Sequence, residues 1–208
     1  FREETTPRPQ DPYGIAKLAA EHVLQNLCDV HGVEWAVAVP HNIIGPRQKY
    51  DDPYRNVASI MMNRMLQGQQ PYVYGDGSQR RCFSYVGDVV PVLARIALDP
   101  DAKSEVFNVG PDEEFVSVLE LAHRIARLLD FDCVPIHTEP RPREVHLATC
   151  SADKARARLG YQTHHSLDDG LRAMIDYIRT RGTRPFDYHL TLEIENELTP
   201  KTWSKRLL

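Results

Sequence analysis

The stretch PYGIAKLAAEHVLQNLCDVHGVEWAVAVP, residues 12–40, decides the fold class of this chain. Residues 33–39 are nearly all apolar and are closed by Pro40, a pattern typical of a buried parallel strand. A helix followed by a buried strand is the signature of an α/β fold. The helix is indicated by apolar side chains at helical spacing, at Ile15, Leu18, Ala19, Val23, Leu27 and Val30.

The rest of the sequence alternates short strands with amphipathic helices. Ser117 and Glu120 have the spacing of a capping box, and Gly160 is placed as a left-handed helix end. The tail from residue 183 is polar and irregular, and we expect it to wrap a surface. We expect helices at residues 56–66, 88–98, 117–129, 152–159 and 166–179, and strands at 71–74, 82–86 and 106–109.

The composition excludes several classes of protein. The formal charge of −4 argues against binding nucleic acid through bulk charge, and no stretch approaches the ~20 apolar residues of a membrane span. Nine histidines show no metal-ligand spacing, so we expect no metal site. Four scattered cysteines, Cys28, Cys82, Cys133 and Cys150, suit a reduced cytoplasmic protein.

Tyr13 and Lys17 stand four residues apart at the start of the first helix, so both side chains lie on one face. A free tyrosine has a pKa near 10, too high for a general base at neutral pH, and a nearby positive charge favours the phenolate. A phenolate can take a hydroxyl proton while the carbon beside it gives up a hydride. The pair therefore indicates redox chemistry at a hydroxyl-bearing carbon, although the same spacing also occurs by chance.

Six segments in order strengthen this interpretation. Residues 12–21 resemble the catalytic helix of the extended short-chain dehydrogenase/reductases, in the branch of NAD-dependent epimerases and dehydratases. The segments that follow resemble this family from the amino terminus to about residue 180; they are residues 40–47, 74–81, 83–88, 106–110 and 141–145.

The resemblance implies roles for particular residues. Tyr13 and Lys17 would be catalytic and would contact the cofactor NAD, whose nicotinamide would also lie beside the backbone of Pro40. A nucleoside-diphosphate sugar, most simply a UDP-sugar, would be held by a second set. Arg81 and Arg141 would contact the diphosphate, because the planar fork of arginine suits phosphate oxygens. The remaining members of that set are Asn42 and Asn56, near the sugar-nucleotide, and Glu144, on a ribose hydroxyl.

Four positions depart from the family pattern. Many members carry Arg at the position of Val39, and Asp at the positions of Cys82 and Ser151. His41 is an unusual neighbour for Asn42, either as a residue that selects a sugar or as a packed or solvent-facing side chain. These departures leave open which sugar is bound.

Two features of the family are missing from these 208 residues. No Gly-x-x-Gly-x-x-Gly turn is present to receive the cofactor pyrophosphate. Only twelve residues precede Tyr13, whereas the family's hydroxyl-polarising Ser or Thr lies about two dozen residues before the tyrosine. We therefore expect a carboxyl-terminal portion of the enzyme that is inactive alone. The residues that separate an epimerase from a 4,6-dehydratase would also be absent.

The expected fold is the carboxyl-terminal part of a Rossmann-like doubly wound parallel sheet with a small α+β substrate lobe. Residues 1–50 would belong to the NAD-binding domain, 51–182 mainly to the substrate lobe, and 183–208 to a tail. The expected function is NAD-dependent epimerisation of a UDP-sugar by a homodimeric enzyme. The alternatives are a nucleotide-sugar 4,6-dehydratase and a nucleotide-binding or assembly module without turnover.

Overall fold

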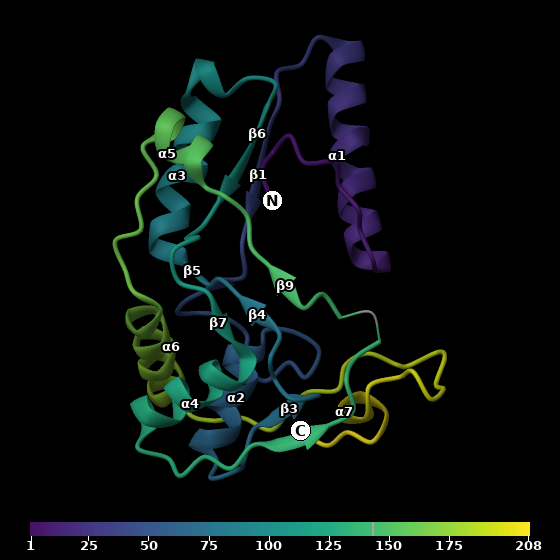
Figure 1. Cartoon of the computed structure of the whole chain (residues 1–208), viewed down its shortest axis with the longest axis vertical. Helices are drawn as coiled ribbons and strands as arrows, with labels where there is room; N and C mark the ends of the chain where they lie inside the picture. The colour runs from purple at the N-terminus through teal and green to yellow at the C-terminus, as the bar shows by residue number, and fades with distance from the viewer. Residues whose placement is uncertain (143) are drawn as a thin grey trace. The chain divides into compact units, whose positions relative to one another are not determined.

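The computed structural model describes residues 1–142 and 144–208, so Arg143 of the expected substrate segment lies outside the described residues. The chain passes more than once between two units, each described by itself below (Figure 1). The first unit comprises Phe1–Ile43, Cys82–Phe115 and Ala148–His165, and the second comprises Ile44–Arg81, Val116–Leu147 and Ser166–Leu208.

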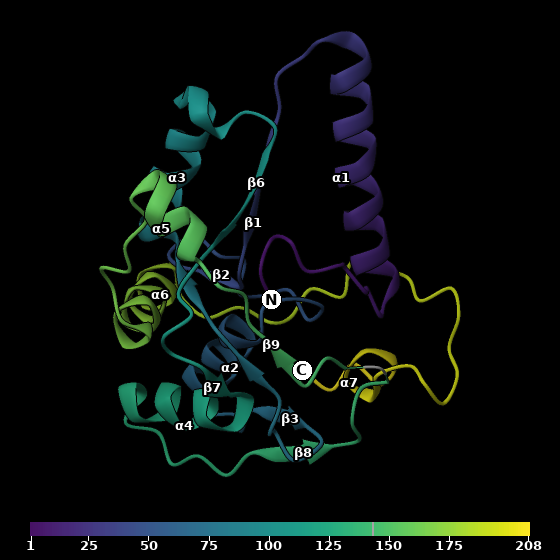
Figure 2. The same ribbon diagram turned by 45° about the horizontal axis from the view of Figure 1, so that its top comes forward.

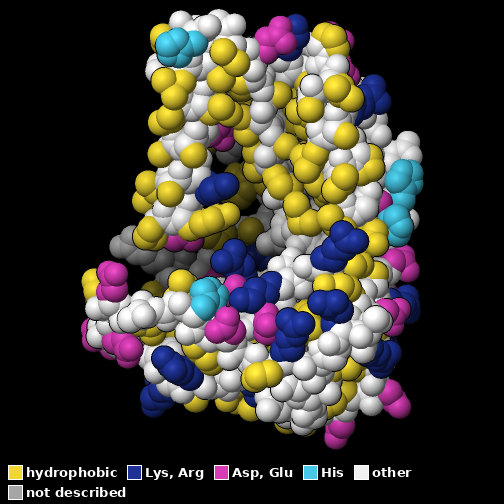
Figure 3. Space-filling model, turned by 180° about the vertical axis from the view of Figure 1, so that it is seen from behind, with side chains coloured by type: hydrophobic (Ala, Val, Ile, Leu, Met, Phe, Trp, Pro, Cys, Tyr) yellow, Lys and Arg dark blue, Asp and Glu magenta, His cyan; other side chains and the backbone are white. Residues whose placement is uncertain are grey.

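The first unit begins with the expected helix, α1 (Pro12–His31). Its start is fixed by Asp11, whose side chain accepts a hydrogen bond from the Gly14 N–H at 2.6 Å, and its end by left-handed Gly32. No residue of α1 is buried. Hydrophobic side chains are exposed along α1 (Figure 3).

The expected parallel strand is β1 (Ala36–Pro40), which pairs with β6 (Glu105–Val109) from Ala36 opposite Glu105 to Pro40 opposite Val109. Parallel pairing is confirmed. The expected burial is wrong, because the first four residues of β1 are only partly buried. Of the helices in this unit, α1 buries no side chain, so the apolar strand is covered incompletely.

Two helices build the core of the first unit, α3 (Val86–Leu98) and α5 (Asp153–Leu159), with the 3₁₀ turn η1 (Pro100–Ala102) following α3. They pack on each other and on the β1–β6 pair (Figure 1). The core contains Val89, Val92, Phe107, Leu159 and Tyr161, all nearly or completely buried.

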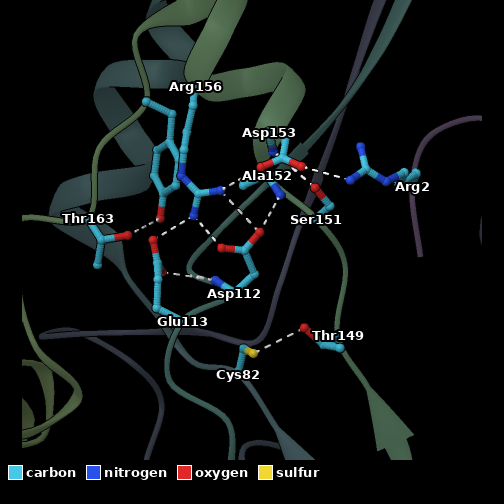
Figure 4. A network of polar contacts seen from close by, with 11 residues as sticks. Arg2, Cys82, Asp112, Glu113, Thr149, Ser151, Ala152, Asp153, Arg156 and Thr163 are labelled. Atoms are coloured by element: carbon cyan, nitrogen blue, oxygen red, sulfur yellow. Dashed lines mark hydrogen bonds and ion pairs between the residues drawn. The ribbon is translucent and has the colours of Figure 1, made fainter.

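A salt-bridge network joins the loop after β6 to the start of α5 (Figure 4). The Arg156 guanidinium pairs with the carboxylates of Asp112 and Glu113, and its Nη1 lies 3.3 Å from Oδ1 of Asp153. Asp112 also accepts a hydrogen bond from the Ala152 N–H at 2.9 Å. Burial acts to raise the pKa of Asp112, but the hydrogen bonds from Arg156 and Ala152 outweigh it and hold that pKa below its ordinary value.

This network predicts an acid-sensitive contribution to stability. The lowered pKa of Asp112 means that its contribution is complete above the unfolded carboxyl pKa near 4 and is lost as the pH falls through the folded-state pKa. Asp112→Asn should lower the free energy of unfolding at pH 7 by about 1–3 kcal/mol, with a smaller difference at pH 3. Urea denaturation at both pH values measures this.

Glu113→Gln is the matched control, because the Glu113 side chain also pairs with Arg156 but is 57% exposed. Exposed ion pairs contribute little, so this variant should unfold nearly as the unmodified chain does. Equal effects of the two substitutions at pH 7 would contradict the assigned role of Asp112.

Three helices form the core of the second unit, α2 (Val57–Leu66), α4 (Val118–Leu129) and α6 (Leu167–Arg181), and they contact one another. The capping box of Ser117 and Glu120 at the start of α4 is confirmed. Ser166 and Asp169 form a second one at the start of α6. The buried side chains include Met61, Met62, Leu121, Ile125, Leu171 and Ile175.

The remaining strands of the chain are short. In the second unit β3 (Tyr72–Tyr74) pairs in parallel with β8 (Ile136–Thr138), as Figure 2 shows. β4 (Arg80–Arg81) pairs antiparallel with β7 (Val116–Ser117) and has β9 (Leu147–Ala148) on its other side. β2 (Ile43–Ile44) and β5 (Ser84–Tyr85) form a separate two-stranded sheet. A short helix, α7 (Lys201–Ser204), lies in the tail.

The expected strand of residues 82–86 is wrong in its extent. The strand β5 covers only Ser84–Tyr85, and α3 already begins at Val86. At Cys82 a side chain far away in the sequence makes the contact: the Cys82 carbonyl accepts a hydrogen bond from the Asn42 amide at 2.8 Å.

Candidate functional site

Tyr13 and Lys17 both lie in the first two turns of α1. Pro12 occupies the first helical position and Asp11 caps it, so the local sequence determines where this face of the helix begins. Tyr13 is 73% exposed and Lys17 is exposed as well. Both polar heads are therefore accessible to a ligand on one face of the helix.

The next two predicted residues, Pro40 and Asn42, lie at the carboxyl end of β1, where β1 pairs with the end of β6. Pro40 is the last residue of β1 and is exposed, and the His41 N–H donates to the Val109 carbonyl at 3.0 Å. Asn42 is exposed and held in place by its bond to the Cys82 carbonyl. In open α/β sheets, ligands bind outside the carboxyl ends of parallel strands, and Pro40 and Asn42 lie at such an end.

His41 is buried next to these residues, with 7% of its surface exposed. Neither ring nitrogen has a hydrogen-bond partner among the described residues. Burial lowers the pKa of His41, and the Pro111 carbonyl and the Asp112 carboxylate offset this only in part. Gly110 makes room for the ring, since a Cβ there would lie 3.0 Å from Nδ1 of His41. His41 is thus a packed side chain rather than a solvent-facing one.

In the second unit the structure brings Arg81 and Glu144 together. Arg81 lies on β4, its Nη1 donates to the carbonyls of Arg80 at 2.8 Å and His146 at 3.3 Å, and its Nη2 lies 3.9 Å from the Glu144 carboxylate. The side chains are only 18% and 21% exposed. Burial lowers the pKa of Arg81 and the charge of Glu144 opposes this shift.

Arg141 is held by aromatic rings. Its guanidinium carbon lies 4.3 Å from the centre of the Tyr74 ring and 5.2 Å from that of the Trp203 ring. Its Nε is buried without a hydrogen-bond partner among the described residues. Sequence reasoning missed Tyr74 and Trp203, because nothing in the local pattern connects them to an arginine so far along the chain.

Asn56 is used by the fold itself. It is the left-handed N-cap of α2, with φ of 63°, and its side chain accepts a hydrogen bond from the Ser59 N–H at 3.2 Å. The first unit therefore carries Tyr13, Lys17, Pro40 and Asn42, and the second carries Asn56, Arg81, Arg141 and Glu144. The ligand-binding roles assigned to all eight remain predictions.

No helix among the described residues combines the length and the hydropathy needed to cross a bilayer. Within residues 1–142 and 144–208, no group of three or more His, Cys, Asp or Glu side chains is arranged to hold a metal ion.

The fold and the site have the features of the short-chain dehydrogenase/reductase class. These are a parallel strand pair, a preceding helix with the Tyr-x-x-x-Lys pair, and an α+β second unit. The model of the NAD dependent epimerase/dehydratase family matches residues 1–110. The chain belongs to this family.

Individual relatives agree with this assignment. The UDP-glucose 4-epimerase of Mycolicibacterium smegmatis is 29% identical over 182 residues, which cover 86% of this chain and 56% of the relative. The solved UDP-glucose 4-epimerase of Thermotoga maritima, with UDP-glucose, is 32% identical, with a TM-score of 0.80 over 87% of this chain and 57% of its own.

A second solved structure is the UDP-glucuronic acid 4-epimerase of Bacillus cereus, in complex with UDP-glucuronic acid and NAD. It has a TM-score of 0.80 and 27% identity over 86% of this chain and 56% of its own. The expected Rossmann-like α/β fold class is confirmed. The chain spans about half the length of the relatives it matches.

Proposed function

We propose that this chain supplies the catalytic tyrosine and the substrate-binding side of an NAD-dependent epimerase that acts on a UDP-sugar. The observation that carries the proposal is the exposed Tyr13–Lys17 pair at the start of α1, followed by a parallel strand, within the family match. The solved relatives with UDP-glucose and UDP-glucuronic acid support the substrate class.

The residues present fit one end of NAD. Tyr13 and Lys17 are exposed on one helix face, and Pro40 ends a parallel strand, as a contact to the nicotinamide end requires. The glycines of this chain include no Gly-x-x-Gly-x-x-Gly turn for the pyrophosphate. Bound NAD would supply the chemistry of accepting and returning a hydride.

The proposed reaction uses Tyr13 as the general base. Its phenolate takes the proton of a sugar hydroxyl as the carbon bearing that hydroxyl loses a hydride, and a keto sugar results. Lys17 stabilises the phenolate by its positive charge. The keto sugar would then rotate in the pocket. Once the hydride was returned to its opposite face, Tyr13 would give the proton back, and the configuration at that carbon would be inverted.

Substrate binding is assigned to the remaining predicted residues. Arg81 would bind the diphosphate, with its side chain already positioned by Glu144 and by two backbone carbonyls. Arg141 would approach the same group. Asn42 and Asn56 would contact the sugar-nucleotide and Glu144 a ribose hydroxyl.

The 208-residue chain is expected to bind UDP and to have little affinity for NAD. The arginines proposed to contact the diphosphate are present, whereas these 208 residues contain no Gly-x-x-Gly-x-x-Gly turn to receive the cofactor pyrophosphate. Isothermal titration calorimetry of the purified chain with UDP and with NAD measures both affinities. Micromolar NAD binding would contradict the expectation, and absence of UDP binding would contradict the substrate assignment.

A further inference from the structure

Arg141 differs from Arg81 in its surroundings. Arg81 has a carboxylate beside it, whereas the described contacts of the Arg141 guanidinium are the rings of Tyr74 and Trp203. Arg141 makes no ion pair with any described residue. Its positive charge is therefore held in place without being neutralised.

Trp203 reaches Arg141 because the tail is anchored at several points in the second unit. Its indole Nε1 donates to the Pro53 carbonyl at 3.2 Å, and its ring is in a T-shaped contact with the Tyr54 ring at a centroid distance of 5.4 Å. The neighbouring Thr202 is buried, and its hydroxyl bonds to that of Tyr74. The tail thus binds the strand that also carries the second ring against Arg141.

This geometry restricts the guanidinium. A cation near aromatic faces is attracted by the ring quadrupoles, and arginine does this while its planar donor fork stays available for hydrogen bonds. Rings on the guanidinium lower the entropy lost when its N–H groups bind an oxyanion, because fewer rotamers remain to be frozen.

We propose that Trp203 is a positioning residue that holds Arg141 ready for the diphosphate, which makes the carboxyl-terminal tail a working part of the nucleotide site. This inference rests on the proposed function, because it takes the UDP-sugar as the ligand. The competing view is that Trp203 only fastens the tail.

Three variants separate the two views by UDP titration. Trp203→Leu should weaken UDP binding about tenfold, because the ring against Arg141 is lost. Trp203→Phe, which keeps a ring, should restore most of the affinity. Tyr188→Phe removes a different anchor, the hydroxyl that donates to the Thr202 carbonyl at 3.3 Å, and should leave binding nearly unchanged.

The pair is tested by repeating Trp203→Leu in an Arg141→Ala background. If Trp203 acts through Arg141, Trp203→Leu should weaken UDP binding less than about twofold in the Arg141→Ala background. Tryptophan fluorescence gives a direct readout of Trp203 in a Trp35→Phe variant. The chain has two tryptophans, so this substitution leaves Trp203 as the sole tryptophan. Its fluorescence should change on addition of UDP and stay constant with uridine, which lacks the phosphates.

Unchanged UDP affinity in Trp203→Leu, or an equal loss with and without Arg141, would overturn this inference while the proposed function stands. An unmodified chain that binds no UDP would contradict the proposed function and this inference together. Circular dichroism of each variant checks that its fold is retained.

Discussion

Tyr13→Phe is expected to reduce turnover by about 10²–10⁴-fold, the range that a positioned general base contributes. Because the chain spans about half of its relatives, the assay uses a chimera in which the amino-terminal part of the Thermotoga maritima UDP-glucose 4-epimerase precedes residue 1. The tyrosine side chain is 73% exposed, so removal of its hydroxyl should leave folding intact.

Separate measurements of kcat and of the affinity for the UDP-sugar distinguish an effect on chemistry from an effect on binding. Loss of the proton acceptor should lower kcat while the affinity for the UDP-sugar, measured by calorimetry, stays nearly constant. A Tyr13→Phe chimera with near-normal turnover would show that another group is the base.

Lys17→Ala is the companion variant. Its turnover should also fall, and the pH profile of kcat should move towards higher pH, because the phenolate loses the ammonium group that favours it. A lowered rate with an unchanged profile would mean that Lys17 acts in binding rather than on the base.

Arg81→Ala is expected to weaken UDP binding roughly ten- to a hundredfold, since a charge-assisted bidentate contact contributes about 1.5–3 kcal/mol. The Arg81 side chain is largely buried and lies beside Glu144, so it is already ordered before the ligand arrives. Arg80→Ala is the matched control. It removes the same charge from the adjacent position of β4, where the side chain is exposed and points to the other face of the strand.

UDP titrations of both variants at two salt concentrations distinguish direct contact from long-range attraction. A general loss of attraction would affect both variants alike and would diminish at high salt. Equal, small effects would show that Arg81 only makes structural contacts, with β4 and with Glu144. The diphosphate site would then have to be sought elsewhere.

The sequence by itself predicted the elements whose signals are local. The apolar repeat of residues 14–30 indicated α1, the Ser117–Glu120 spacing indicated the start of α4, and Gly160 indicated the end of α5. Helix periods, caps and stops involve residues a few positions apart, so they can be read from a single sequence. The ordered motifs likewise led to the correct family.

Only the tertiary structure decided how the polar residues are used. It assigned the Asn56 side chain to capping α2, placed Arg81 on a two-residue strand beside Glu144, and brought Trp203 of the tail onto Arg141. Short strands have no periodicity to detect, and these contacts join residues far apart in the chain. Their formation depends on packing within the second unit, which no local pattern encodes.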